Sequence, residues 1–479
     1  MKARATSGIA WTAIEKFAQQ ALQFAIGIVI ARILSPQEYG IIGMTAIFFA
    51  VANTFVESGF GSALIQKKDR NEADYSTCFY FNIAVSLALY ALLWAAAPYI
   101  ATFYRTPVLS DVIRGLGISL VINSASIAQT TKLTAEMRFK EMAKVTMATQ
   151  VVTGAAGIVL AYRGYGVWAL VFQQVSGSAV KLLLIEVCTR WRPALVFSRS
   201  SFRHMFSYGS KILCSSLINT VYDNLYTLVI GRMFAAKDVG FYNRGNQFAT
   251  LPTSTLLSVF MKVAFPLMAE VQDDTEKLRK AYKKFIRTPL FILYPTLCCL
   301  IALADPLICS LLGDKWQPAA PLLQVLCLGA FFDPLTHINL NVLYVKGRTD
   351  LVLKLELIKK PIAFIILFAS LPLGLFWLCF GRSVYGLVAY CFNCHYTKKF
   401  INFGFWQQIW YNVPVLLKSV IAGLASYAAS SIPTTPISQL LAGASAGALT
   451  FIALAVTTHD ETWEDIKQVA KERIKGKQL

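Results

Sequence analysis

The sequence predicts an all-α protein that crosses a membrane about 14 times. The chain of 479 residues is 56% hydrophobic and 15% charged, with a mean hydropathy of +0.53, whereas a soluble protein carries roughly a quarter charged residues. Its charges occur in short clusters separated by apolar runs. Such runs are about 20 residues long, the length at which a helix crosses the hydrocarbon core. The chain is therefore predicted to be a polytopic membrane protein.

Each predicted span is an apolar run between two polar or charged segments. The first follows Lys2 and Arg4, and a cleavable signal peptide is not expected there because Glu15 and Lys16 interrupt the apolar stretch. Three spans, the fourth, seventh and eighth, contain many Ser, Thr, Asn and Tyr residues, so a re-entrant or surface helix is the alternative for them. The fourteen spans are expected at 9–31, 40–65, 77–102, 110–131, 146–162, 166–188, 207–231, 241–268, 289–312, 319–345, 361–379, 384–401, 411–431 and 437–456.

The placement of Lys and Arg predicts the orientation of these spans. If the N-terminus is cytoplasmic, 31 of the 45 Lys and Arg residues fall in cytoplasmic segments and only 8 in outer segments. Short loops with this bias indicate that both termini are cytoplasmic. The formal charge of +19 is then mostly a consequence of topology and requires no nucleic acid partner. The basic run at 277–287 is best interpreted as a helix that faces solvent or lipid headgroups.

An internal repeat is visible in the sequence. The segments ARILSPQEYG (31–40) and GRMFAAKDVG (231–240) share an Arg, an acidic residue and a Gly at equal positions, and YGVWAL (165–170) matches YGLVAY (385–390). Because six spans separate equivalent points, the two halves have the same orientation. The predicted parts are an N-lobe at 1–190 with spans one to six, a C-lobe at 207–401 with spans seven to twelve, spans thirteen and fourteen at 411–456, and an amphipathic cytoplasmic tail at 457–479.

Two parallel lobes with a binding site at their interface are typical of secondary transporters. Polar residues inside spans usually face the interior of such a bundle. Cations inside the bundle suit a phosphate or diphosphate substrate. The alternative for each such residue is that its side chain snorkels to the lipid headgroups or pairs with a neighbour. The candidate cationic residues are Lys16, Arg32, Arg114, Lys211, Arg232, Arg244 and Lys262. The candidates for ion coupling are Glu57, Asp223, Asp333 and His337, each with an interhelical hydrogen bond as the alternative.

The cysteines give little indication of chemistry. The stretch CFNCH (391–395) fits the C-x-x-C-H pattern of covalent haem attachment, but the predicted topology places it at the cytoplasmic end of a span. Simple packing of buried thiols is the preferred interpretation. We expect no metal site and no cofactor.

Five stretches together resemble one family of membrane transporters. They are ILSPQEYGIIGM (33–44), ESGFGSALIQKKD (57–69), DNLYTLVIGRMFAAKDVGFYNRGNQFATLP (223–252), KVAFPLMAEVQDDTEKLRKAYKK (262–284) and LLGDKWQPAAPLLQVL (311–326). They resemble the oligosaccharide/polysaccharide flippases of bacterial surface-glycan pathways, called Wzx proteins. The likeness is strongest to the colanic-acid and O-antigen lipopolysaccharide exporters of the multidrug/oligosaccharidyl-lipid/polysaccharide superfamily.

The resemblance implies a transporter rather than an enzyme. The implied activity is to flip an undecaprenyl-diphosphate-linked repeat unit across the bacterial cytoplasmic (inner) membrane by alternating access, driven by a Na⁺ or H⁺ gradient. Its partners would be this glycolipid, membrane lipids and other polysaccharide-assembly proteins. A cation-coupled multidrug exporter of the same superfamily is the alternative, although the surplus of Lys and Arg argues against it. A membrane glycosyltransferase, polymerase or ligase is a further alternative, and short outer loops argue against it.

Overall fold

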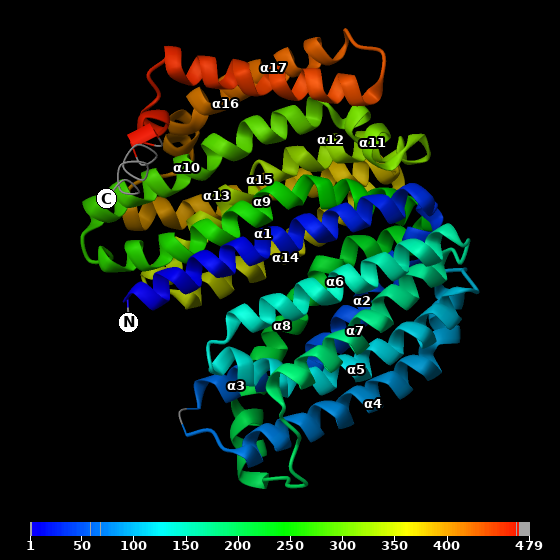
Figure 1. Cartoon of the computed structure of the whole chain (residues 1–479). Helices are drawn as coiled ribbons and strands as arrows, with labels where there is room; N and C mark the ends of the chain where they lie inside the picture. Colours follow the sequence, from blue (N-terminus) through cyan, green and yellow to red (C-terminus); the bar gives the residue numbers. More distant parts are fainter. Residues whose placement is uncertain (1, 58, 68, 466, 469–479) are drawn as a thin grey trace. The chain divides into compact units, whose positions relative to one another are not determined.

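The computed structural model describes residues 2–57, 59–67, 69–465 and 467–468, and these residues form helices and short connections with no strand (Figure 1). The side chains of residues 2–17, 211 and 215 lie outside the described part. The chain divides into two compact units, Met1–Asn243 (unit 1) and Arg244–Leu479 (unit 2). The prediction of an all-α membrane protein is confirmed.

Unit 1 is a bundle of long helices joined by short turns. Within it α4 packs against α5, α5 and α6 against α7, α1 against α6, and α2 against α8. Its helices are α1 (Lys2–Ile33), α2 (Pro36–Glu57), α3 (Phe60–Gln66), α4 (Glu72–Phe103), α5 (Leu109–Ala135), α6 (Phe139–Tyr162), α7 (Val167–Thr189), α8 (Arg199–Met233) and the first residues of α9 (Ala236–Glu270).

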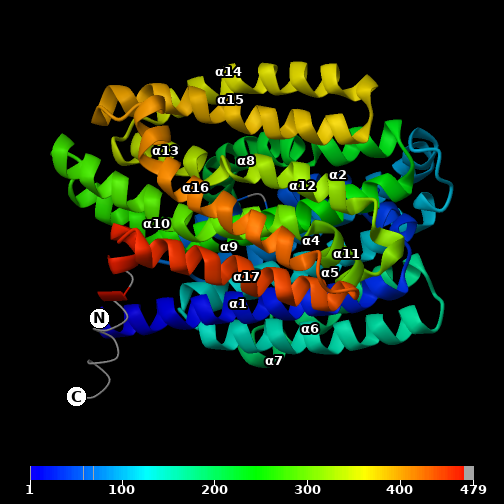
Figure 2. The ribbon, with the colours of Figure 1, turned by 90° about the horizontal axis from the view of Figure 1, so that it is seen from above.

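Unit 2 is built around α15 and α10. The helices α12, α13 and α14 pack against α15, while α10 packs against α16, which lies beside α17 in both views (Figure 1 and Figure 2). After the remainder of α9, its helices are α10 (Thr275–Ala302), α11 (Ala304–Leu312), α12 (Ala319–Ala330), α13 (Asp333–Val345), α14 (Thr349–Ser370), α15 (Leu375–Ile401), α16 (Phe405–Ser430) and α17 (Pro436–Thr457), with single 3₁₀ turns at Asp314–Trp316 and Leu371–Leu373.

Every predicted span falls on helical segments, but the span predicted at 361–379 covers the second half of α14, a 3₁₀ turn and the start of α15, so its bounds are wrong. Eleven segments of the described chain are long and apolar enough to cross a membrane. The three predicted spans outside this set belong to α1, α8 and α14. In α1 the described apolar part is Ala18–Ile33, which is shorter than a full span. Helix α8 contains many polar residues, and Lys359 and Lys360 lie in the middle of α14.

Four predicted spans are broken in the structure. Two of them, at 289–312 and at 361–379, are divided at Leu303 and at the 3₁₀ turn Leu371–Leu373. The span at 40–65 is divided into α2 and α3 at Gly59, whose φ of 68° is left-handed and therefore favours glycine. The span at 319–345 is divided into α12 and α13 at Phe331–Phe332. Hydropathy does not reveal these breaks, because the helices on both sides of each break are apolar and buried.

The unit boundary and the predicted lobe boundary lie at different positions. Unit 1 ends at Asn243, so it includes α8, which the repeat assigns to the C-lobe. In the structure α8 packs along α2 and also contacts α3 and α4. The lobes stay a prediction based on the sequence repeat. Most of the predicted amphipathic tail at 457–479 lies outside the described residues.

Candidate functional site in unit 1

A polar cavity of about 760 Å³ lies inside unit 1. Its walls come from α2, α3, α5, α7 and α8, and its lining is rich in hydroxyl and amide side chains. The polar lining residues are Asn53, Thr54, Glu57, Ser62, Asn123, Ser126, Thr130, Thr131, Thr134, Lys181, Ser216 and Thr220.

The hydroxyl groups on α5 donate their protons to backbone carbonyl groups of the same helix. Ser126 donates to the carbonyl of Asn123 (2.8 Å), Thr130 to that of Ser126 (2.7 Å) and Thr134 to that of Thr130 (2.9 Å). This back-bonding engages the proton of each hydroxyl and leaves oxygen lone pairs as acceptors. One wall of the cavity is therefore a row of acceptors, which suits the hydroxyl groups of a sugar.

Glu57 and Lys181 are the charged residues of the cavity wall. The Glu57 charge acts on the Lys181 ammonium, yet among the described residues neither side chain is within the 4 Å ion-pair distance of a partner. Lys181 is half-buried and Glu57 is exposed. A charged group that is placed inside a membrane bundle without a close partner is available to a ligand.

The cavity lies toward one end of unit 1. Its lining positions fall in the second half of α2 and α5, late in α7 and in the first two thirds of α8. With the orientation expected from the Lys and Arg bias, this end is the cytoplasmic one.

The opposite end of unit 1 is closed by two helix starts in backbone contact. A Cβ atom on Gly40 would lie 1.6 Å from the carbonyl oxygen of Ala236, and one on Gly240 would lie 2.1 Å from that of Pro36. The contact is reciprocal, because Gly40 with Gly240 and Pro36 with Ala236 are equivalent positions of the sequence repeat. Only glycine permits this approach.

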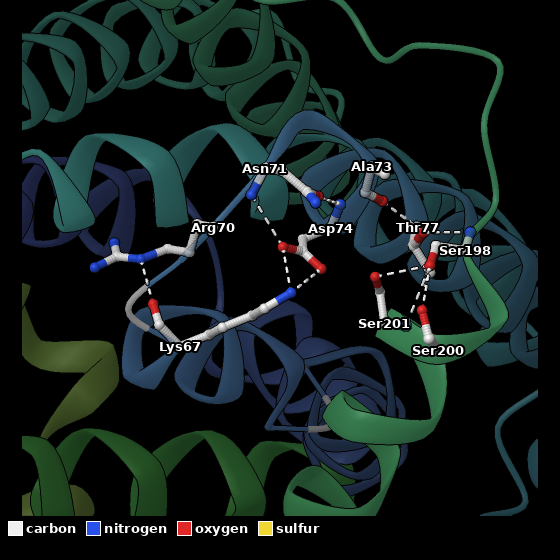
Figure 3. A network of polar contacts seen from close by, with 9 residues as sticks. All are labelled: Lys67, Arg70, Asn71, Ala73, Asp74, Thr77, Ser198, Ser200 and Ser201. Atoms are coloured by element: carbon white, nitrogen blue, oxygen red, sulfur yellow. Dashed lines mark hydrogen bonds and ion pairs between the residues drawn. The ribbon is translucent and has the colours of Figure 1, made fainter.

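A network of polar contacts joins the end of α3, the start of α4 and the start of α8 (Figure 3). The Lys67 ammonium donates to both carboxylate oxygens of the buried Asp74, each at 2.7 Å. Asn71 and Asp74 form a capping box at the start of α4, and the Ser198 backbone N–H donates to Thr77 Oγ1 at 2.9 Å. These bonds join α4 to the end of α3 and to the start of α8, two of the elements that line the cavity.

Three predicted cations lie at helix ends away from the cavity. Arg32 is exposed in the last turn of α1. The Arg114 guanidinium carbon lies 4.8 Å from the centre of the Trp94 ring, and that of Arg232 lies 5.1 Å from the centre of the Phe103 ring. Such stacking at a span end matches the snorkelling alternative more closely than a cavity lining.

Of the other four predicted cations, two have side chains outside the described part and two lie in unit 2. The side chains of Lys16 and Lys211 are outside the described part. In unit 2, Arg244 donates to Gln247 Oε1 at 2.6 Å and lies over the Trp316 ring at 5.9 Å, while Lys262 is exposed on α9.

Of the predicted coupling residues, the cavity of unit 1 includes Glu57 only. Asp223 is exposed on α8. In unit 2, Asp333 and His337 lie one turn apart on α13 and interact electrostatically with each other, and Arg382 of α15 also acts on Asp333. The structure therefore brings Asp333 and His337 together, in a different unit from Glu57.

Sequence reasoning missed Lys181, although a signal for it existed. Helix α7 is largely apolar, but Gln174, Ser178 and Lys181 follow one another at i, i+4 and i+7, which places them on one face. The other charged residue of α7, Glu186, lies five positions from Lys181, so no i, i+3 or i, i+4 ion pair marks it in the sequence.

Unit 2 contains an apolar groove of about 650 Å³. Its walls come from α10, the end of α12 and α16, and include Tyr294, Leu328, Phe331, Leu416 and Val420. Asp305 and Gln324 are the polar exceptions. The groove suits a hydrocarbon chain rather than a sugar.

Comparison with known proteins gives one family and several relatives. A sequence model of a family described as "Polysaccharide biosynthesis protein" matches residues 29–321. The lipopolysaccharide biosynthesis protein WzxC of Escherichia coli is 26% identical over 75% of this chain and 73% of its own. The succinoglycan biosynthesis transport protein ExoT of Rhizobium meliloti is 24% identical over 98% of this chain and 96% of its own. Among solved structures, a lipid II flippase MurJ in an inward closed conformation shares the fold, with a TM-score of 0.76 and 14% identity over 93% of this chain and 98% of its own.

Proposed function

Because the chain belongs to the polysaccharide biosynthesis protein family, we propose that it flips an undecaprenyl-diphosphate-linked oligosaccharide across the bacterial cytoplasmic membrane. The glycolipid enters from the cytoplasmic leaflet and leaves in the outer leaflet, where the surface polysaccharide is assembled. Both termini are cytoplasmic in this proposal. The observation that carries it is the polar cavity of unit 1, which combines a row of hydrogen-bond acceptors with a cation that has no ion-pair partner among the described residues.

The cavity chemistry fits the two polar parts of this substrate. The hydroxyl and amide groups of Asn53, Asn123 and Ser216 have the donors and acceptors that sugar hydroxyls need. Lys181 supplies the positive charge that a diphosphate needs, and an ammonium serves as a point charge for phosphate oxygens. The apolar groove of unit 2 has the right chemistry for the polyprenyl chain.

The relatives support transport rather than synthesis. ExoT is named as a transport protein for succinoglycan biosynthesis, and MurJ, whose fold this chain shares, is named as a lipid II flippase. We therefore propose a transporter that changes no covalent bond. Its energy would come from a Na⁺ or H⁺ gradient, with Glu57 as the coupling group because its carboxylate faces both the cavity and Lys181.

The test is the lipid content of a host from which the gene has been deleted. The proposal predicts that complete diphosphate-linked repeat units accumulate and that the surface polymer is lost, because assembly proceeds while crossing fails. Truncated units would show a role in synthesis instead. A normal lipid profile with increased sensitivity to cationic drugs would favour the multidrug exporter. The gene with a Lys277→Ala change serves as a matched rescue control, because Lys277 is exposed, pairs with Asp274 and lies in the other unit from the cavity.

A further inference from the structure

A second, smaller cavity of about 250 Å³ lies at one end of unit 2. Four cations of α10 line it, and they recur at i, i+3, i+4 and i+7, so they share one face of the helix. The opposite side comes from the start of α16 and from the segment after α17. We call this cavity the basic groove. Its lining residues are Lys280, Lys283, Lys284, Arg287, Thr288, Tyr411, Glu461, Thr462 and Asp465.

The carboxylates near the basic groove neutralise only part of its charge. The buried Asp460 accepts from Lys418 at 2.6 Å and from Arg287 at 3.2 Å, and Lys284 pairs with Asp465 at 2.7 Å. The lining itself has four cations against two carboxylates, Glu461 and Asp465. A surplus of positive charge therefore faces the groove.

Two of the lysines have no carboxylate partner among the described residues. Lys280 is exposed at the groove. The Lys283 ammonium lies 5.0 Å from the centre of the Phe403 ring and 5.5 Å from that of Tyr411, so aromatic faces hold it at the groove without neutralising it. The buried Nε–H of Arg287 also has no acceptor in the described part of the chain.

The groove lies at the level expected for lipid headgroups. Trp406 and Trp410 follow one another at i and i+4 on the first turns of α16, and their side chains are 70% and 72% exposed. Exposed tryptophans of this kind mark the membrane–water interface. The Lys and Arg bias assigns this end of unit 2 to the cytoplasmic side, where anionic lipids attract basic segments.

We propose that the basic groove binds a phosphate group through the cations and hydroxyl groups of its lining. Lys280 and Lys283 supply the charges without a described carboxylate partner, Arg287 adds a guanidinium that Asp460 neutralises in part, and Tyr411 and Thr462 complete a polar pocket. The phosphate comes either from an anionic phospholipid or from free phosphate in the cytoplasm. The groove shares no residue with the cavity of unit 1 and is too small for an oligosaccharide.

This site also has a structural consequence for the segment after α17. That segment supplies Glu461, Thr462 and Asp465 to the groove and is tied to α10 and α16 through Asp460. A phosphate bound between α10 and this segment would strengthen the same connection. Binding should therefore raise the thermal stability of the protein.

The experiment uses the full-length protein in a neutral detergent, with native mass spectrometry to count bound ligands. Phosphatidylglycerol is added in one arm and inorganic phosphate in the other. The test variant is K280Q/K283Q, which keeps both side chains polar. The control is K277Q/R279Q, which removes two charges from the same helix outside the groove, where both residues already pair with carboxylates.

The expected result is one bound ligand whose affinity falls about tenfold or more in K280Q/K283Q, equivalent to at least ~1.4 kcal/mol, and stays unchanged in K277Q/R279Q. Binding of phosphatidylglycerol identifies a lipid source, and binding of inorganic phosphate alone identifies a soluble source. An equal loss in both variants, or no saturable binding in either arm, would overturn the proposal. The melting temperature with and without ligand shows whether each variant is folded.

Discussion

The two units treat polar residues inside the membrane-spanning bundle in different ways. In unit 2 the Asn339 side chain accepts from Tyr282 (3.0 Å) and Gln408 (3.0 Å), and its own amide donates to Gln408 (3.1 Å). The buried Lys359 is likewise paired, with Glu356 at 2.6 Å. The bonds of Asn339 hold α10, α13 and α16 together, while Lys359 and Glu356 pair within α14, so these groups are engaged with one another.

Unit 1 leaves its polar residues open to a cavity. Glu57 and Lys181 face about 760 Å³ of space, and no described partner lies within ion-pair distance of either. A polar residue in a span therefore marks a site when some of its hydrogen-bonding or ion-pairing capacity is unused. Its presence in the span alone is not enough. A lysine in each unit, Lys181 and Lys359, allows this conclusion to be tested directly.

The largest expected effect comes from Lys181→Met. Transport should fall about a hundredfold, because the cavity loses the cation that faces the diphosphate, and charge-assisted hydrogen bonds are among the strongest available. The melting temperature should hardly change. Rescue of surface polymer in the deletion host measures the transport.

The matched change in unit 2 is Lys359→Met. Here the melting temperature should fall, because Glu356 loses its closest cation inside the bundle, while the protein that remains folded should transport normally. If the two variants behaved alike, the comparison between the units would be wrong.

The closed end of unit 1 provides the next prediction. Gly40→Val and Gly240→Val should each lower the free energy of unfolding by about 3 kcal/mol, because the new side chain meets a backbone carbonyl rather than a flexible group. Thermal melting measures the loss. Gly177→Ala, whose Cβ would be 3.9 Å from its nearest neighbour, is the control and should melt normally. A tolerated Gly40→Val would contradict the contact.

The hydrogen-bond network of unit 2 gives a smaller effect. Asn339→Leu should lower the free energy of unfolding by about 2 kcal/mol, since Tyr282 and Gln408 lose a buried partner. Transport per folded molecule should be unchanged. A loss of transport at normal stability would show that this network also belongs to a site.

The smallest effect concerns Asp460 and depends on pH. Burial alone raises the pKa of its carboxyl, but the hydrogen bond from Lys418 and the charge of Arg287 outweigh burial and hold the pKa below its ordinary value. The stabilisation is therefore complete above pH ~4 and is lost as the pH falls further. Asp460→Asn should lower the free energy of unfolding by about 1 kcal/mol at pH 7. The difference from wild type should shrink below pH ~4, and a constant difference across this range would refute the assignment.

Most of the fold could be predicted from the sequence because apolar length decides where helices cross a membrane. The breaks at Gly59 and at Phe331–Phe332 could not, since hydropathy is continuous through both. The closure at Gly40 and Gly240 was visible as a repeat, but its role depends on backbone distances that no sequence pattern contains.

The candidate site was predicted less well than the fold. Glu57 was predicted from the sequence and lines the cavity. Arg32, Arg114 and Arg232 lie at span ends, where a long side chain reaches the interface from any face of its helix. Lys181 shares a polar stripe with Gln174 and Ser178, but a stripe does not show whether it faces a cavity or a neighbouring helix. Which lysine faces a cavity depends on how α2, α5, α7 and α8 pack, and that is a tertiary property.

The most direct test of the central claim is a flipping assay with purified protein in vesicles that carry an undecaprenyl-diphosphate-linked repeat unit in one leaflet. Appearance of the glycan at the opposite surface is followed with a membrane-impermeant lectin or glycosidase. We predict rapid crossing with the wild-type chain and with Lys277→Ala, and crossing slowed about a hundredfold with Lys181→Met. Crossing no faster than in protein-free vesicles, or equal rates for wild type and Lys181→Met, would contradict the account.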